Sequence, residues 1–185
     1  MTANHPARCW QQAAASLALL ILLAGCGDGD KTAMTAYGRA DQVRAYRDRI
    51  DAVIADANAV QDGIEAAAVG TAGEATGENL SAALEQFRPQ LVLALAELRG
   101  LDPPESLAGL HAEMERLLTL RLEALDQVAV GWSVEQAESY AAAQPLYEEA
   151  ESKLNEARDL AANVNEDLAA VDVALAEAEG GQVVA

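Results

Sequence analysis

His111 is the first residue to consider for metal chemistry, because it is the only histidine that follows the apolar leading stretch of the chain. Di-iron bundles need repeated Glu-x-x-His pairs and zinc hydrolases need His-Glu-x-x-His, and neither pattern occurs. Met114 follows one helical turn later, and an imidazole and a thioether on one face could hold copper. The alternative is that both side chains border the core. We therefore predict no resident metal or cofactor.

Nucleophilic catalysis would need a hydroxyl beside a general base, and His111 is the sole imidazole that could act as that base. The acidic stretch at 147–159, YEEAESKLNEARD, has the pattern of a solvated helix face, with Glu149 and Lys153 as an i,i+4 pair. We expect no catalytic residues.

Two further residues could contact a ligand or a partner. Arg121 falls within the apolar face of a predicted helix, between Met114 and Val128. A buried guanidinium needs an acidic partner, and such a pair could line a ligand pocket. Alternatively, Arg121 reaches from the bundle edge toward an acid such as Glu151. Trp132 could be an exposed recognition residue, or it could pack on the next turn at a helix start.

The apolar stretch before Cys26 has an informative length. Residues 13–23, AAASLALLILL, are too few for a bilayer-spanning helix of about 20 residues and suit a signal peptide. The residues at 23–26, LAGC, resemble the lipobox of bacterial lipoproteins. That resemblance implies diacylglyceryl transfer to the Cys26 sulfur, cleavage after Gly25 and further acylation with fatty chains such as palmitate. An ordinary secretory signal with an incidental cysteine is the alternative.

Lipidation of Cys26 would make the protein a membrane-anchored lipoprotein on the extracytoplasmic side of the cell envelope, since two or more acyl chains anchor stably. Gly27 favours the outer membrane in a Gram-negative host, although Asp28 follows it. Cysteine chemistry is excluded as an activity, because Cys9 would leave with the signal peptide and Cys26 would be modified.

Composition indicates helices and argues against nucleic acid. Hydrophobic residues make up 51% of the 185 residues but aromatic residues only 4%, so alanine and leucine dominate, which favours helices.

The chain carries 12 basic and 30 acidic residues, a net charge of −18. Phosphate backbones repel such a chain, so no nucleic-acid partner is expected. An excess of acidic residues is more often a matter of solubility than a sign of a cationic partner.

The basic residues are concentrated in the segment that directly follows Cys26. Residues 26–49 hold five basic and four acidic side chains, whereas residues 50–185 hold six and 26. We expect Arg44, Arg47 and Arg49 to lie near anionic headgroups while the acidic remainder projects outward.

The elements that must position these residues are predicted to be helices, because apolar residues recur at spacings of three and four with no strand pattern. We predict an all-α, up-down-up-down four-helix bundle over 38–179, with helices over 38–69, 79–100, 103–130 and 134–179. Pro89 should kink the second helix and Pro145 should bend the long fourth one. The segment GWS at 131–133 should end the third helix, with Ser133 and Gln136 as the capping box of the fourth.

The remaining segments are predicted to lie outside the bundle: a signal peptide at 1–25, a flexible tether at 26–37 and a disordered tail at 180–185. The joint LRGLDPPESLAGLH is similar to hairpin joints of bacterial helical lipoproteins over 14 residues.

Together these features predict a lipid-anchored envelope protein that binds or scaffolds, with another envelope protein or a peptidoglycan component as its partner. The alternative is an extracytoplasmic bundle that binds a small ligand or metal around His111 and Arg121. A cavity in the bundle interior that both side chains line would favour the second function.

Overall fold

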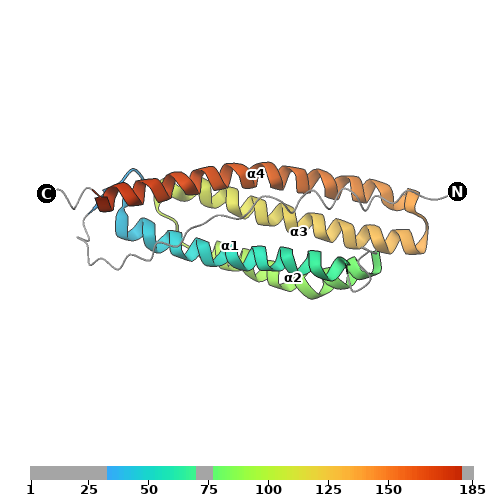
Figure 1. Cartoon of the computed structure of the whole chain (residues 1–185). Helices are drawn as coiled ribbons and strands as arrows, with labels where there is room; N and C mark the ends of the chain where they lie inside the picture. Colours follow the sequence, from blue (N-terminus) through green and yellow to red (C-terminus); the bar gives the residue numbers. More distant parts are fainter. Residues whose placement is uncertain (1–32, 70–76, 181–185) are drawn as a thin grey trace.

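The computed structural model describes residues 33–69 and 77–180. The described part is all-α apart from one short hairpin, which confirms the predicted class (Figure 1). Its four helices are α1 (Ala40–Val69), α2 (Gly77–Arg99), α3 (Ala108–Ala137) and α4 (Tyr140–Gly180). A 3-10 turn, η3 (Glu105–Leu107), precedes α3. The predicted signal peptide, Cys26 and the residues after Gly180 lie outside the described residues.

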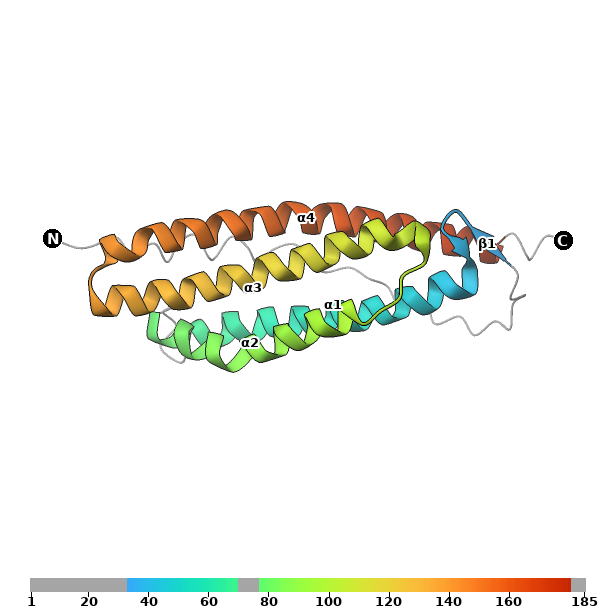
Figure 2. The same ribbon diagram turned by 180° about the vertical axis from the view of Figure 1, so that it is seen from behind.

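The helices lie side by side and form an elongated rod (Figures 1 and 2). Packing is densest within the pairs α1–α2 and α3–α4, and α2 joins the two pairs by packing on α3. The backbones of α1 and α4 approach each other at few positions. At 41 residues α4 is the longest helix and measures about 60 Å. Side chains, rather than close backbones, must therefore connect α1 to α4.

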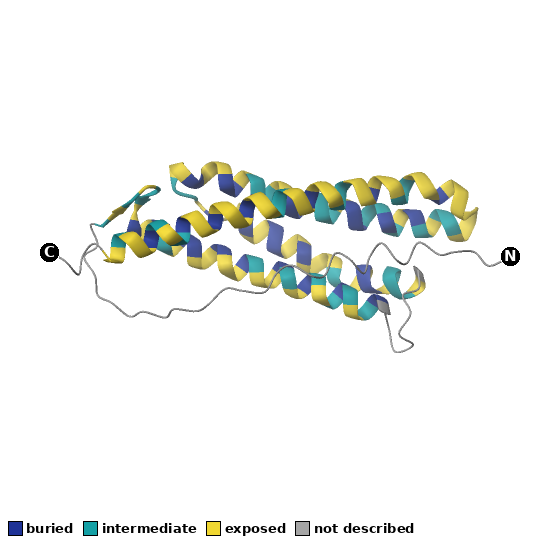
Figure 3. Ribbon diagram, turned by 45° about the horizontal axis from the view of Figure 1, so that its top comes forward, coloured by how far each residue is buried: buried dark blue, intermediate teal, exposed yellow. Residues whose placement is uncertain are grey.

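The buried residues recur along each helix at the expected spacing, as the dark blue bands of the ribbon show (Figure 3). In α1 they include Val43, Ile50, Val53 and Val60. In α4 the deepest row is Ala143, Ala150, Ala157, Val164 and Val171, whereas Tyr140 at the start of the helix is exposed. Small side chains in that row let α4 approach α3 closely, which explains the dense packing of this pair.

The break between the last two helices is not where the sequence predicts it. Helix α3 continues through GWS to Ala137, and the Oγ of Ser133 donates to the carbonyl oxygen of Ala129 at 3.2 Å, as in a helix interior. The break falls at Glu138 and Ser139, and the Ser139 Oγ accepts from the N–H of Ala142 at 3.3 Å. The predicted capping box at Ser133 is therefore wrong, and Ser139 caps α4.

Gly131 explains the missed boundary. A Cβ built at this position would lie 2.7 Å from Cε1 of Tyr147, which is closer than real contacts allow. Glycine is therefore needed for the approach of the two helices and does not end α3.

A hairpin replaces the last part of the predicted tether. Strands β1 (Met34–Thr35) and β2 (Gly38–Arg39) pair antiparallel, and Gly38 has the positive φ of 115° that the turn requires. The hairpin packs against α4, and the Oγ of Ser106 donates to the carbonyl of Tyr37. Regular structure is thus present before residue 38, where the bundle was predicted to begin, and strands of two residues are too short to give an alternating pattern.

Both helical prolines lie inside continuous helices. Pro89 lies within α2, and Pro145 lies in the second turn of α4 because that helix begins at Tyr140. Helix α4 arches gently along its length in Figures 1 and 2 instead of bending sharply at Pro145. A proline close to a helix start disturbs fewer hydrogen bonds of the preceding turn than one at mid-helix.

Candidate functional site

His111 is a core histidine with both ring nitrogens occupied. Its Nδ1 lies 2.8 Å from the hydroxyl oxygen of Tyr46, and its Nε2 lies 3.0 Å from Oε1 of Glu115. A neutral imidazole protonated on Nε2 satisfies both contacts, with the tyrosine hydroxyl donating to Nδ1. The other carboxylate oxygen of Glu115 accepts from Nε of Arg99 at 3.2 Å. A metal could bind His111 only by breaking one of these bonds.

The order hydroxyl, imidazole, carboxylate is that of an activated nucleophile, but the surroundings oppose this role. Tyr46 is only 5% exposed, so a substrate cannot reach its oxygen. Burial, with a smaller effect of the Glu115 carboxylate, raises the pKa of Tyr46 to about 12. The hydroxyl therefore stays protonated, and this chain of contacts joins α1 to α3.

Arg121 lines a cavity of about 60 Å³ between α1, α3 and α4. The walls are mainly apolar, and the side chains of Asn58 and Asn165 add amide groups. Within the described residues no carboxylate pairs with the Arg121 guanidinium, so the predicted reach toward Glu151 is not observed. Burial without a counter-charge lowers the pKa of Arg121.

His111 and Arg121 do not form one site. They are ten residues apart on α3, which corresponds to about 15 Å along its axis, and His111 does not line the Arg121 cavity. Met114 does line that cavity, whereas both nitrogens of His111 are engaged elsewhere. The structure therefore does not form the sequence-derived copper pair or a combined pocket.

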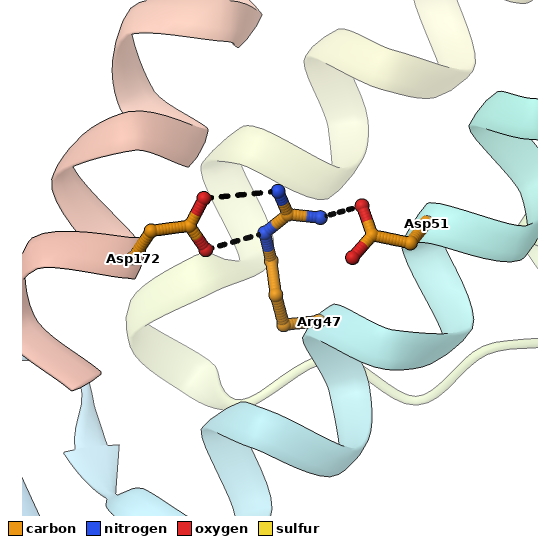
Figure 4. A network of polar contacts seen from close by, with 3 residues as sticks. All are labelled: Arg47, Asp51 and Asp172. Atoms are coloured by element: carbon orange, nitrogen blue, oxygen red, sulfur yellow. Dashed lines mark hydrogen bonds and ion pairs between the residues drawn. The ribbon is translucent and has the colours of Figure 1, made fainter. Parts of the chain in front are cut away.

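Arg47 shows what a fully partnered buried arginine looks like in this fold (Figure 4). It is 5% exposed, and Nε and Nη2 contact the two carboxylate oxygens of Asp172 at 2.9 and 3.1 Å. Its Nη1 also donates to Asp51. Burial alone would lower the pKa of Arg47, but the two carboxylates outweigh it and raise the pKa. This network connects α1 to α4 across their loosely packed seam.

The expectation that the early arginines face a membrane is wrong for Arg47, and for Arg44 and Arg49 it stays a prediction. Arg47 is buried, and Arg44 pairs with Glu179 near the end of α4. Because α1 begins where the acidic α4 ends, these cations neutralise acids of the same molecule. Arg49 remains exposed on α1.

Trp132 lies in the last turns of α3, at the end of the rod opposite the β hairpin (Figure 2). Its side chain is half-buried, and since it lies inside α3 it does not pack at a helix start as predicted. Tyr147 donates its hydroxyl to Glu135 at 2.8 Å, and its ring centroid lies 6.1 Å from that of Tyr140. We call these three aromatic residues the aromatic tip.

No family model, curated protein or solved structure matches this chain. None of the described helices contains an apolar window long enough to cross a membrane. Within residues 33–69 and 77–180, no three histidine, cysteine, aspartate or glutamate side chains are grouped as metal ligands. The function must therefore be argued from the LAGC motif, the Arg121 cavity and the aromatic tip.

Proposed function

We propose that this protein is a lipid-anchored cell-envelope protein whose helical rod acts by binding and not by catalysis. The LAGC motif at 23–26 carries the proposal, because it offers Cys26 for acylation. The chain enters the rod at one end, through a hairpin that packs on α4. A protein held by fatty chains such as palmitate on Cys26 would then project its aromatic tip about 60 Å from that entry point. In a Gram-negative host, Gly27 favours the outer membrane.

The geometry of the polar clusters favours binding over catalysis. In the Tyr46–His111–Glu115 chain, the hydroxyl and the imidazole are buried, and the raised pKa of Tyr46 keeps its hydroxyl protonated. The carboxylates bound to Arg47 are partly exposed, but they are held by the buried guanidinium that connects α1 to α4. Neither cluster offers a reacting atom to a substrate, so we assign no catalytic residue.

The anchor can be tested by labelling cells with a palmitate analogue. Cys26→Ser should abolish incorporation of the label and leave residues 1–25 uncleaved. Cys9→Ser is the matched control and should be labelled and processed like the natural protein, because Cys9 lies before the cleavage site. Equal labelling of the Cys26→Ser protein would overturn the anchor.

The partner is proposed to be another envelope protein or a peptidoglycan component that contacts the aromatic tip. Aromatic side chains are enriched at interfaces, and this end of the rod exposes Tyr140 by 45% and Val130, two residues before Trp132, by 51%. A photo-crosslinking residue at Val130 should capture this partner in intact cells. The matched position is Val173, which is 58% exposed near the opposite end of the rod. Equal capture at both positions would argue against the tip.

A second function, binding of a small extracytoplasmic ligand, is favoured by the cavity beside the unpaired Arg121. The metal-binding form of this alternative loses its support, because His111 is hydrogen-bonded through both nitrogens.

A further inference from the structure

Six of the nine arginines among the described residues pair with carboxylates, and Arg49 and Arg158, which have no such pair, are exposed. The ion pairs include Arg39–Asp41, Arg44–Glu179, Arg47–Asp172, Arg88–Asp126, Arg99–Glu115 and Arg116–Glu156. Arg121 differs from these: among the described residues it is a half-buried arginine that has no acidic partner. A desolvated charge without a counter-ion is unfavourable, so a partner from outside the chain would be stabilising.

The cavity beside Arg121 is accessible to such a partner. It lies on the α1–α4 seam, where the two backbones approach at few positions, and it opens past Asn165, which is exposed. No described nitrogen or oxygen side-chain atom is both enclosed and without a hydrogen-bond partner, so the Arg121 nitrogens remain in reach of solvent. Ala57 and Ala161 line the cavity, and their small side chains leave its space unfilled.

We infer that this cavity binds a small aliphatic carboxylate, held by the Arg121 guanidinium with its hydrocarbon part against the apolar walls. The inference rests on the second function, small-ligand binding, and names its ligand class. A guanidinium forms a planar fork that matches the two oxygens of a carboxylate. The amides of Asn58 and Asn165 can donate to the lone pairs that remain.

Size and charge restrict the ligand further. The cavity of about 60 Å³ is much smaller than the cavity of about 150 Å³ that accommodates benzene, so the hydrocarbon part must be short. No acidic residue lines the cavity, so the ammonium group of an amino acid would lack a partner. Phosphate has no apolar part to place against the walls. Butyrate is therefore a suitable probe.

Binding is measured on the full-length protein in dodecyl maltoside, by calorimetry and by the NMR signals of the Asn58 and Asn165 side-chain amides. Butyrate should shift these amides and bind at least tenfold more tightly than butyramide, butylamine or inorganic phosphate. Arg121→Met should reduce butyrate binding at least tenfold. Arg116→Met removes an exposed arginine of the same helix and should leave binding unchanged.

A second variant tests the cavity without changing charge. Ala161→Leu should fill the cavity and abolish binding, whereas Ala162→Leu, at an exposed neighbour, should not. Far-UV circular dichroism establishes that each variant is folded.

The outcomes separate the ligand class from the site. Equal shifts with butyrate and butyramide would overturn the carboxylate class and leave a small-ligand site. Equal binding of phosphate would also overturn it. If no probe shifts the two amides, the ligand site itself is refuted, and none of these results bears on acylation of Cys26.

Discussion

The buried Arg47 and the half-buried Arg121 should respond in opposite directions to the same substitution. Arg47 contributes three contacts with carboxylates, whereas Arg121 contributes none with the described residues. We expect Arg47→Met to destabilise the protein and Arg121→Met to stabilise it. Methionine is chosen because it keeps an unbranched apolar stem of similar length and removes only the charge and its hydrogen bonds.

The magnitudes follow from the surroundings of each side chain. Hydrogen bonds to charged groups contribute about 1.5–3 kcal/mol each when both partners are buried. Asp172 and Asp51 are 39% and 50% exposed and can be rehydrated, so we take about 1 kcal/mol for each of the three bonds. The apolar end of methionine returns about 1 kcal/mol. Arg47→Met should therefore lower the free energy of unfolding by about 2 kcal/mol, or the Tm by about 4–8 °C.

For Arg121→Met the same reasoning reverses the sign. The variant removes a partly desolvated charge that has no counter-ion and places a methyl group on an apolar cavity wall. Because the guanidinium is only half-buried, we take a gain of about 1 kcal/mol, or about 2–4 °C in Tm. Urea unfolding followed by circular dichroism at 222 nm, in buffer free of carboxylates, measures both variants. Equal destabilisation by the two substitutions would refute the claim that Arg121 lacks a partner.

Three smaller perturbations test other parts of the fold, all by the free energy of unfolding. Gly63→Ala should lower the free energy of unfolding by about 1–3 kcal/mol, because its Cβ would clash with the ring of Phe87. Gly109→Ala should raise it by about 0.5–1 kcal/mol, because open space surrounds that position. A gain at both positions would contradict the packing of Gly63 against Phe87. Ser139→Ala should lower the free energy of unfolding by about 1 kcal/mol, because it removes the cap of α4, whereas Ser133→Ala should leave it nearly unchanged. A larger loss at Ser133 than at Ser139 would support the helix boundary predicted from the sequence. Burial raises the pKa of Tyr46 to about 12, so the folded protein keeps a proton that the unfolded chain loses near pH 10. The contribution of Tyr46 to stability should therefore be constant below about pH 10 and fall between about pH 10 and 12. Tyr46→Phe should weaken that fall.

The helices could be predicted from sequence because periodic apolar residues report burial directly. In α1 the buried residues Val43, Ile50 and Val53 lie at multiples of the three- and four-residue spacings from which the helices were predicted. The end of α3 could not be predicted, because a glycine that breaks a helix and a glycine that admits a neighbouring ring look alike in sequence. Only the position of Tyr147 against Gly131 distinguishes them.

The site was predicted in part for a similar reason. The helical wheel placed Arg121 on the apolar face, and the structure puts it on a cavity wall. The partners of charged residues were missed, since Arg47 and Asp172 are 125 positions apart and meet only once α1 and α4 are in register. Trp132 was placed at a helix start because the sequence predicted a helix break at 131–133, whereas α3 continues to Ala137.

The central claim is that fatty chains on Cys26 hold the helical rod at a membrane. Mass spectrometry of the protein extracted from cell envelopes tests it most directly. We predict that the amino-terminal residue is Cys26, that residues 1–25 are absent, and that the added mass equals a diacylglyceryl group with or without a further acyl chain. An unmodified Cys26, or a chain that still begins at Met1, would contradict the proposed anchor.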